Sequence, residues 1–260
     1  DEDITVTIGT AGTSTEGTDY TDGSGNIDDI TISAGATTGT VNFTPTDDSV
    51  YEGDETGIVA IDTVSGADAT ESGTQSVTIT INENESAPTV TLATSATSIA
   101  ENAGSSLTLT ATSSIVADED ITVTLTTSGT GTEGTDYATI SDITISAGAT
   151  TGTASFTPTD DNVYEGNETG IVAIDTVSGG SANESNTPQV VTITITENES
   201  APTVTLATSA TSIAENAGSS LTLTATLSVA TTANVTVSLD GTGGTGTEGT
   251  DFGTVSDIAI

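Results

Sequence analysis

The stretch Thr159-Asp160-Asp161-Asn162-Val163-Tyr164-Glu165-Gly166-Asn167-Glu168-Thr169 holds four acidic residues and no basic one. It occurs earlier, almost unchanged, as Thr46-Asp47-Asp48-Ser49-Val50-Tyr51-Glu52-Gly53-Asp54-Glu55-Thr56. The chain of 260 residues has 38 acidic residues and no Lys, Arg or His, which gives a formal charge of −38. Because closely spaced like charges repel, such a stretch needs a cation from outside the chain. A divalent ion that prefers oxygen ligands is the first candidate.

The composition argues against several functions. Without Lys or Arg, neither nucleic acid nor anionic lipid is expected as a partner. The absence of Cys and His removes thiolate sites, the usual zinc ligands and the usual general base. A carboxylate-pair glycosidase would lack aromatic residues for its cleft, since only 3% of residues are aromatic. We therefore expect a protein that is not an enzyme. No apolar run is long enough to span a bilayer, so no membrane insertion is expected.

Segments between the acidic stretches alternate apolar residues with small polar ones. Examples are Thr-Val-Thr-Leu, Ser-Leu-Thr-Leu-Thr and Val-Thr-Ile-Thr-Ile, and this period of two is typical of half-buried strands. The pattern argues against the disorder that high charge and few aromatics would otherwise suggest. It predicts an all-β fold.

The alternating segments belong to tandem repeats of about 114 residues. Glu85-Ser86-Ala87-Pro88-Thr89 returns as Glu199-Ser200-Ala201-Pro202-Thr203, and Thr15-Glu16-Gly17-Thr18-Asp19-Tyr20 has counterparts beginning at Thr132 and Thr247. This period suits a β-sandwich domain. We expect a partial first repeat (1–85), a complete second repeat (86–199) and a partial third repeat (200–260). Pro88 and Pro202 predict short, stiff joints and hence a rod.

Seven strands are expected in the second repeat. Their predicted ranges are 89–94, 105–112, 120–126, 139–146, 151–157, 170–176 and 189–196. Residues 146–150 are expected to form a hairpin loop. The acids follow strand ends that emerge on one side of a sandwich, whereas loops of the opposite side, such as 146–150, carry none.

The second repeat resembles the Calx-beta domain along its whole length. The resemblance rests on Ala100-Glu101-Asn102-Ala103-Gly104, Gly134-Thr135-Asp136-Tyr137, the acidic stretch 160–168, and Val191-Thr192-Ile193-Thr194-Ile195 with the acids that follow. It implies a seven-stranded, immunoglobulin-like sandwich that binds several Ca²⁺ ions at one tip. It also implies the Ca²⁺-ligand positions Glu101, Asp136, Asp160, Asp161, Glu165, Glu168, Glu197 and Glu199.

The flanking repeats offer smaller sets of the same ligand positions. The set of the first repeat is Asp19, Asp47, Asp48, Glu52, Glu55, Glu83 and Glu85, and the set of the third is Glu215 and Asp251. Asn162 and Asn198 stand where calcium-binding members often carry Asp, which predicts fewer ions or weaker binding. Glu16, Asp54 and Glu133 lie next to the clusters and are expected to be solvated loop charges.

Three functions follow from these features. The first is an extracellular, calcium-stiffened structural repeat of a surface adhesin, fibre or matrix filament, secreted by a prokaryote, with Kd for Ca²⁺ about 10⁻⁴ to 10⁻³ M. Its partners would be calcium ions, adjacent repeats, and cell-surface or matrix ligands. The second is a calcium-sensing regulatory domain, which would bind at submicromolar calcium. The third is a self-assembling filament subunit whose partial repeats are completed by neighbouring copies.

Overall fold

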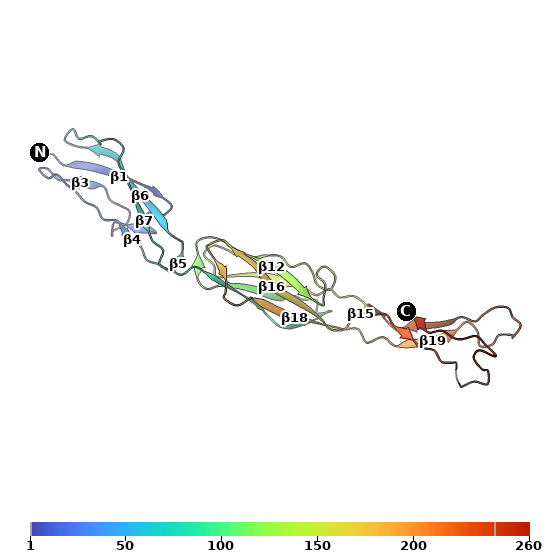
Figure 1. Cartoon of the computed structure of the whole chain (residues 1–260). Coiled ribbons are helices and arrows are strands. Elements are labelled where there is room, and N and C mark those ends of the chain that lie inside the picture. The colour runs from blue at the N-terminus through green and yellow to red at the C-terminus, as the bar shows by residue number, and fades with distance from the viewer. Residues whose placement is uncertain (1, 242) are drawn as a thin grey trace.

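The computed structural model describes residues 2–241 and 243–260 and shows three β units arranged in a row (Figure 1). No helix occurs among these residues, and none is therefore available to cross a membrane. The all-β prediction and the elongated arrangement of tandem units are confirmed.

The second repeat is a two-layered sandwich. One sheet has the order β13-β12-β16-β18-β9 and the other the order β14-β10-β8-β17. Its strands are β8 (Thr89–Thr94), β9 (Ser98–Ala100), β10 (Leu107–Ser113), β11 (Val116–Ala117), β12 (Ile121–Gly129), β13 (Ile143–Ile145), β14 (Thr151–Phe156), β15 (Val163–Tyr164), β16 (Glu168–Ser178), β17 (Asn183–Glu184) and β18 (Val190–Thr196).

The core of this sandwich comes from the alternating residues. In β14, Gly152, Ala154 and Phe156 are buried and the residues between them are exposed, as the period of two requires. Val90, Leu109, Val123, Val172 and Ile193 have no exposed surface, and they join the two sheets into one cluster.

One strand prediction and one loop prediction for the second repeat need correction. The strand predicted at 139–146 is formed only at β13, and the Ile140 amide before it bonds to the Glu133 side chain rather than to a neighbouring strand. The predicted hairpin loop 146–150 instead carries the chain from one sheet to the other, since β13 pairs with β12 and β14 pairs with β10.

The first repeat has one four-stranded sheet, of order β3-β1-β6-β7, and a short β2-β4 pair. Its strands are β1 (Ile4–Gly12), β2 (Tyr20–Thr21), β3 (Ile30–Ile32), β4 (Thr44–Pro45), β5 (Val50–Tyr51), β6 (Glu55–Ser65) and β7 (Ser76–Ile81). The described part of this repeat has no counterpart of the β14-β10-β8-β17 layer, so the sheet covers its core from one side only.

The third repeat has two separate strand pairs, β19-β20 and β22-β23. Its strands are β19 (Val204–Thr208), β20 (Leu223–Leu227), β21 (Ala230–Thr231), β22 (Thr236–Val237) and β23 (Ile258–Ala259). None of its described residues, 200–241 and 243–260, is buried.

Consecutive repeats are joined by strand pairs as well as by the chain. β5 of the first repeat pairs in parallel with β11 of the second, and β15 of the second pairs in parallel with β21 of the third. Each joint therefore brings the acidic stretch of one repeat against a short strand of the next.

Candidate metal centres at the ends of the repeats

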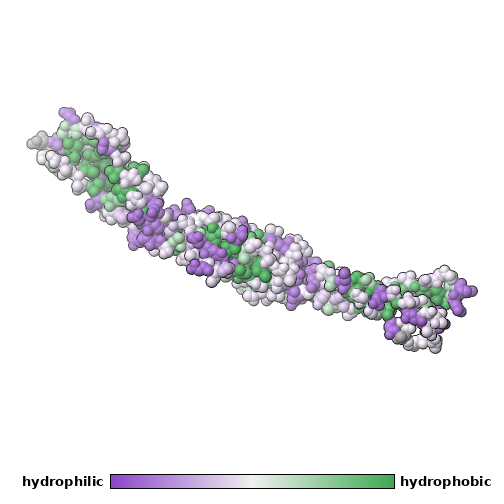
Figure 2. All heavy atoms as spheres, viewed as in Figure 1, coloured by the Kyte–Doolittle hydropathy of each residue, from purple (hydrophilic) through white to green (hydrophobic). Residues whose placement is uncertain are grey.

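Three groups of carboxylates converge closely enough to hold a cation. In each group the nearest carboxylate oxygens lie within 4.8 Å of one another. The members are Asp19, Glu52 and Glu55 (the first-repeat cluster), Asp136, Glu165 and Glu168 (the inner cluster), and Glu101, Glu197 and Glu199 (the outer cluster). Hydrophilic residues gather visibly where the first repeat meets the second (Figure 2).

A tyrosine anchors the loop that carries the first acid of the inner cluster. Asp136 accepts a bond from the Thr132 amide at 2.6 Å, which closes the turn Thr132–Asp136. The next residue, Tyr137, is 1% exposed and stacks on Phe156 with ring centroids 4.7 Å apart. Asp19, Tyr20 and Phe43 repeat this arrangement in the first repeat, where the centroids are 4.4 Å apart. A buried ring thus fixes the position of a surface carboxylate.

Glu197 fixes the acidic stretch itself. Its Oε2 accepts hydrogen bonds from the amides of Glu165 and Gly166 at 2.6 and 2.8 Å, and its Oε1 accepts from Glu199 at 2.9 Å. Burial raises the pKa of Glu197, but these amide bonds outweigh it and bring the pKa to about 2. Glu83 makes the same bonds in the first repeat.

One member of each cluster has its pKa raised to about 7. Burial is the main cause for Glu52, Glu168 and Glu101, followed by the charges of Asp19, Asp136 and Glu197 respectively. Ionisation of these carboxylates is therefore opposed by burial and by their neighbours' negative charge. A cation among them would favour their ionised form.

Two buried oxygen atoms are also left without a partner in the described structure. They are Oε2 of Glu199, in the outer cluster, and Oγ of Ser14, whose backbone amide bonds to Thr56 next to Glu55. Buried polar atoms normally have partners, so these orphans fit a ligand that the protein itself does not supply. All available donors are oxygens, which suits Ca²⁺. When bound, the ion supplies the positive charge that the chain lacks.

The remaining predicted ligands lie beside the clusters rather than in them. Asp161 and Asp48 accept the amides of Val163 and Val50, and Asp47 accepts from the Asn84 side chain. Asp160 contributes charge next to Glu199, and Glu85 lies beside Glu83. In the third repeat, the Asp251 side chain accepts the Thr247 amide, and Asp251 forms no close group with Glu215 among the described residues.

Asn198 and its first-repeat counterpart Asn84 donate hydrogen bonds to acids. The side-chain amide of Asn198 bonds to Glu199 at 3.2 Å, and that of Asn84 bonds to Asp47 at 2.8 Å. At these positions an amide relieves some of the repulsion that an aspartate would add.

The prediction that Glu16 and Glu133 are solvated loop charges is wrong, whereas Asp54 is exposed as expected. Glu133 accepts bonds from the Thr127 hydroxyl at 2.6 Å and the Ile140 amide at 2.8 Å. Glu16 does the same with Thr10 and Ile27, and Asp54 accepts the Glu83 amide. A carboxylate can accept loop amides as well as face solvent, and the sequence alone does not distinguish these two roles.

Acids also occur at the opposite end of the second repeat, where sequence analysis expected none. Asp120 accepts the Ala147 amide at 2.8 Å and Glu119 accepts the Gly180 amide at 3.0 Å. Their neighbour Asp118 donates its backbone amide to Tyr51 of the first repeat at 3.3 Å. The run Asp118–Asp120 directly before a predicted strand could have indicated acids at this end of the repeat.

A family model described as "Calx-beta domain" matches the chain three times, at residues 1–85, 83–199 and 197–258. Among solved structures, the apo form of the Calx CBD1 domain is 16% identical, with 43% of this chain and 99% of that chain covered and a TM-score of 0.36. CBD12 from CALX1.2 is 15% identical, with 75% and 88% covered and a TM-score of 0.35. The calcium binding domain CBD12 of CALX1.1 is 12% identical, with 75% and 87% covered and a TM-score of 0.31. No match was found among curated proteins.

Proposed function

Because the chain belongs to the Calx-beta domain family, we propose that it is a calcium-stiffened structural segment of an extracellular adhesin, surface fibre or matrix filament, secreted by a prokaryote. One observation carries the proposal: carboxylates converge at the end of a repeat that touches the next repeat. An ion bound there would restrain the joint together with the loops. The role is mechanical, and no reaction is assigned to it.

The first test compares the chain in millimolar calcium with the chain in excess chelator. An ion that binds only the folded state stabilises it by RT ln(1 + [L]/Kd), which is about 2.7 kcal/mol at 100 times Kd. We expect a higher unfolding temperature by calorimetry and a narrower distribution of rod lengths by small-angle scattering. Equal unfolding temperatures and equal lengths in both conditions would contradict the proposal.

The affinity separates this role from calcium sensing. Open sites of extracellular modules bind with Kd about 10⁻⁴ to 10⁻³ M, whereas a sensor must respond at much lower calcium. Isothermal titration with CaCl₂ measures this directly, and submicromolar binding would favour a regulatory domain.

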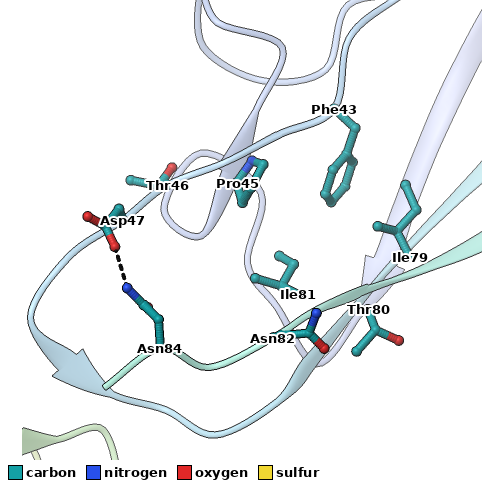
Figure 3. A pocket seen from close by; sticks show the side chains of 9 residues that line it. All are labelled: Phe43, Pro45, Thr46, Asp47, Ile79, Thr80, Ile81, Asn82 and Asn84. Atoms are coloured by element: carbon teal, nitrogen blue, oxygen red, sulfur yellow. Dashed lines mark hydrogen bonds between the residues drawn. The ribbon is translucent and has the colours of Figure 1, made fainter. Parts of the chain in front are cut away.

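A self-assembling filament subunit is a second candidate, favoured by an open groove in the first repeat. The groove has a volume of about 470 Å³ and its lining includes Phe43, Ile79 and Ile81 (Figure 3). In the second repeat, the sheet containing β8 and β10 covers the equivalent face. The third repeat carries the equivalent hairpin, β19-β20, with Leu206 53% and Leu223 39% exposed. We therefore propose the β19-β20 hairpin of another copy as the occupant of the groove.

Sedimentation equilibrium of the full chain tests this candidate. Assembly through the groove predicts a mass that rises with protein concentration and falls back to the monomer in Leu206→Asp. The matched control is Thr205→Asp, which adds the same charge to the same strand. A constant monomer mass at every concentration would rule the candidate out.

A further inference from the structure

The first joint has three carboxylates that the second joint lacks, and one of them, Asp118, faces the preceding repeat. Asp118 directly follows β11, the strand of the second repeat that pairs with the first, and the period of about 114 residues puts Thr232 at the same place in the third. The flanking acids Glu119 and Asp120 likewise become Ala233 and Asn234. The two joints are otherwise built alike, because each uses a parallel pair of two-residue strands.

The strand register brings Asp118 to the first-repeat cluster. Val116 pairs with Val50 and Ala117 with Tyr51, and the bond from the Asp118 amide to the Tyr51 carbonyl continues this ladder. One residue further, Asp118 stands beside Glu52, a member of the cluster. Neighbours in a parallel pair project their side chains to the same side of the sheet.

The charges agree with this placement. Partial burial and the charge of Asp19 are the larger causes of the raised pKa of Glu52 and of Glu55, and the charge of Asp118 adds to both. The pKa of Asp118 is raised in turn by partial burial, by Glu119 and by Asp19. No carboxylate of the third repeat affects Glu165 or Glu168 in this way among the causes of their raised pKa values.

An independent feature points to a ligand at the same cluster. The Oγ of Ser14 is buried, with the residue 7% exposed, and has no partner in the described structure. Gly131 stands at this position in the second repeat, and a Cβ there would lie 3.4 Å from Oε2 of Glu168, the counterpart of Glu55. In the first repeat itself, the Ser14 Oγ lies 3.5 Å from where a Cβ on Gly57 would stand, two residues after Glu55, and it has no hydrogen-bond partner among the described residues.

We propose that Asp118 is a ligand supplied in trans by the second repeat, so that a divalent cation in the first-repeat cluster bridges two repeats, whereas the inner cluster holds its cation without the third repeat. The inference rests on the proposed calcium binding. Its consequence is that calcium locks the first joint more tightly than the second, because binding of the ion and docking of the second repeat favour each other reciprocally.

Titration of the full chain with CaCl₂ tests the proposal. Asp118→Asn keeps the shape of the side chain and removes its charge, and we expect one class of sites to weaken on the order of tenfold. The control is Asp68→Asn, which makes the same charge change in an exposed loop at the other end of the first repeat. Asp68 has a φ of 57°, which asparagine tolerates.

The distance between spin labels in the first and second repeats measures how rigid the first joint is. The chain has no cysteine, so Thr63→Cys with Thr153→Cys gives two unique label sites in the first and second repeats. We expect calcium to narrow the spin-label distance distribution in the parent chain and in Asp68→Asn, and to narrow it less in Asp118→Asn at the same calcium concentration. If Asp118→Asn disrupts the β5-β11 pairing itself, the reverse variant Thr232→Asp gives the test, because it adds the carboxylate to the second joint. Tighter calcium binding by one class of sites in Thr232→Asp supports the proposal, and unchanged calcium affinity overturns it.

The experiments distinguish failure of the proposed calcium binding from failure of the bridging role of Asp118. A parent chain that binds no calcium overturns the proposed function together with this inference. A parent chain that binds calcium, with Asp118→Asn indistinguishable from Asp68→Asn in affinity and in distance distribution, overturns the bridging role alone.

Discussion

Glu197 and Glu199 stand two positions apart and have different tasks. Amide bonds to its two oxygens keep Glu197 ionised, with its pKa about 2 although burial opposes this. Burial and the hydrogen bond with Glu197 instead raise the pKa of Glu199, whose Oε2 has no partner. Glu197 therefore positions the acidic stretch, and Glu199 remains available to an ion. Residue type alone does not distinguish the two roles, and the sequence predicted both glutamates as Ca²⁺ ligands.

The raised pKa values predict how the stability of the calcium-free chain depends on pH. Glu52, Glu101 and Glu168 have pKa values of about 7 in the folded chain against an ordinary value of 4.5. Their contribution favours folding below pH 4.5 and is lost as pH rises through 7, because the folded state binds the additional protons. Glu83 and Glu197, with pKa values of about 2, act oppositely and lose their contribution as pH falls below 4.5.

The unfolding temperature of decalcified protein should therefore be higher at pH 5 than at pH 8, measured by circular dichroism at constant ionic strength. Saturating calcium should reduce the difference, since it removes the advantage of the protonated form. An unfolding temperature that rises from pH 5 to pH 8 without calcium would contradict the assigned pKa values.

At the scale of the elements, a glycine ends β12 where the loop toward the inner cluster begins. Gly129 has a φ of +123°, and a Cβ on it would stand 2.1 Å from the Thr169 carbonyl oxygen. Gly129→Ala should thus lower the free energy of unfolding by at least about 2 kcal/mol and disturb the loop that holds Asp136.

Urea unfolding, followed through the tyrosines, measures this effect as a change in midpoint at constant slope. Gly166→Ala is the control, because Gly166 has a φ of +81° but no heavy atom within 4 Å of the added Cβ. It should cost only about 1–2 kcal/mol from backbone strain. Equal losses of unfolding free energy in the two variants would contradict the prediction, because the added Cβ at position 129 would then cause no destabilisation through its contact with Thr169.

Strands with a period of two were predictable, and contacts between elements were not. β8, β14 and β18 lie where apolar and polar residues alternate, because one face of each strand packs on the core. The shortness of β13 depends on the bond from the Ile140 amide to Glu133, a contact made in the folded loop. The position of Asp118 beside the first-repeat cluster was not predictable from the sequence, because it depends on the pairing of β11 with a strand of another repeat. Alternation within one strand carries no information about that register.

At the scale of the whole molecule, the charge of −38 is spread along a rod and repels itself. Raising NaCl from 0.01 M to 1 M shortens the Debye length from about 30 Å to about 3 Å and should raise the unfolding temperature of the calcium-free chain. Millimolar CaCl₂ should raise it further than NaCl of equal ionic strength, because the clusters bind the ion rather than merely being screened. Calorimetry in matched salts measures this, and equal effects of the two salts would indicate screening alone.

The three repeats should differ in their resistance to proteolysis. Chymotrypsin suits the comparison because trypsin has no Lys or Arg to cleave. Phe252 is 38% exposed in a repeat whose described residues are all at least partly exposed, whereas Tyr137 and Phe156, at 1% and 0%, lie in the complete core. Since cleavage needs local unfolding around the site, the first cut should follow Phe252 and the cuts after Tyr137 and Phe156 should come last.

Calcium should slow the cut after Tyr51, which lies at the first joint beside Glu52, and leave the cut after Phe252 unchanged. Glu215 and Asp251 form no close group among the described residues, so the third repeat gains little from the ion. Mass spectrometry of timed digests, with urea-unfolded chain as the reference for intrinsic cleavage rates, gives the order of the cuts. Protection of Phe252 by calcium equal to that of Tyr51 would mean that the third repeat binds the ion despite its scattered acids.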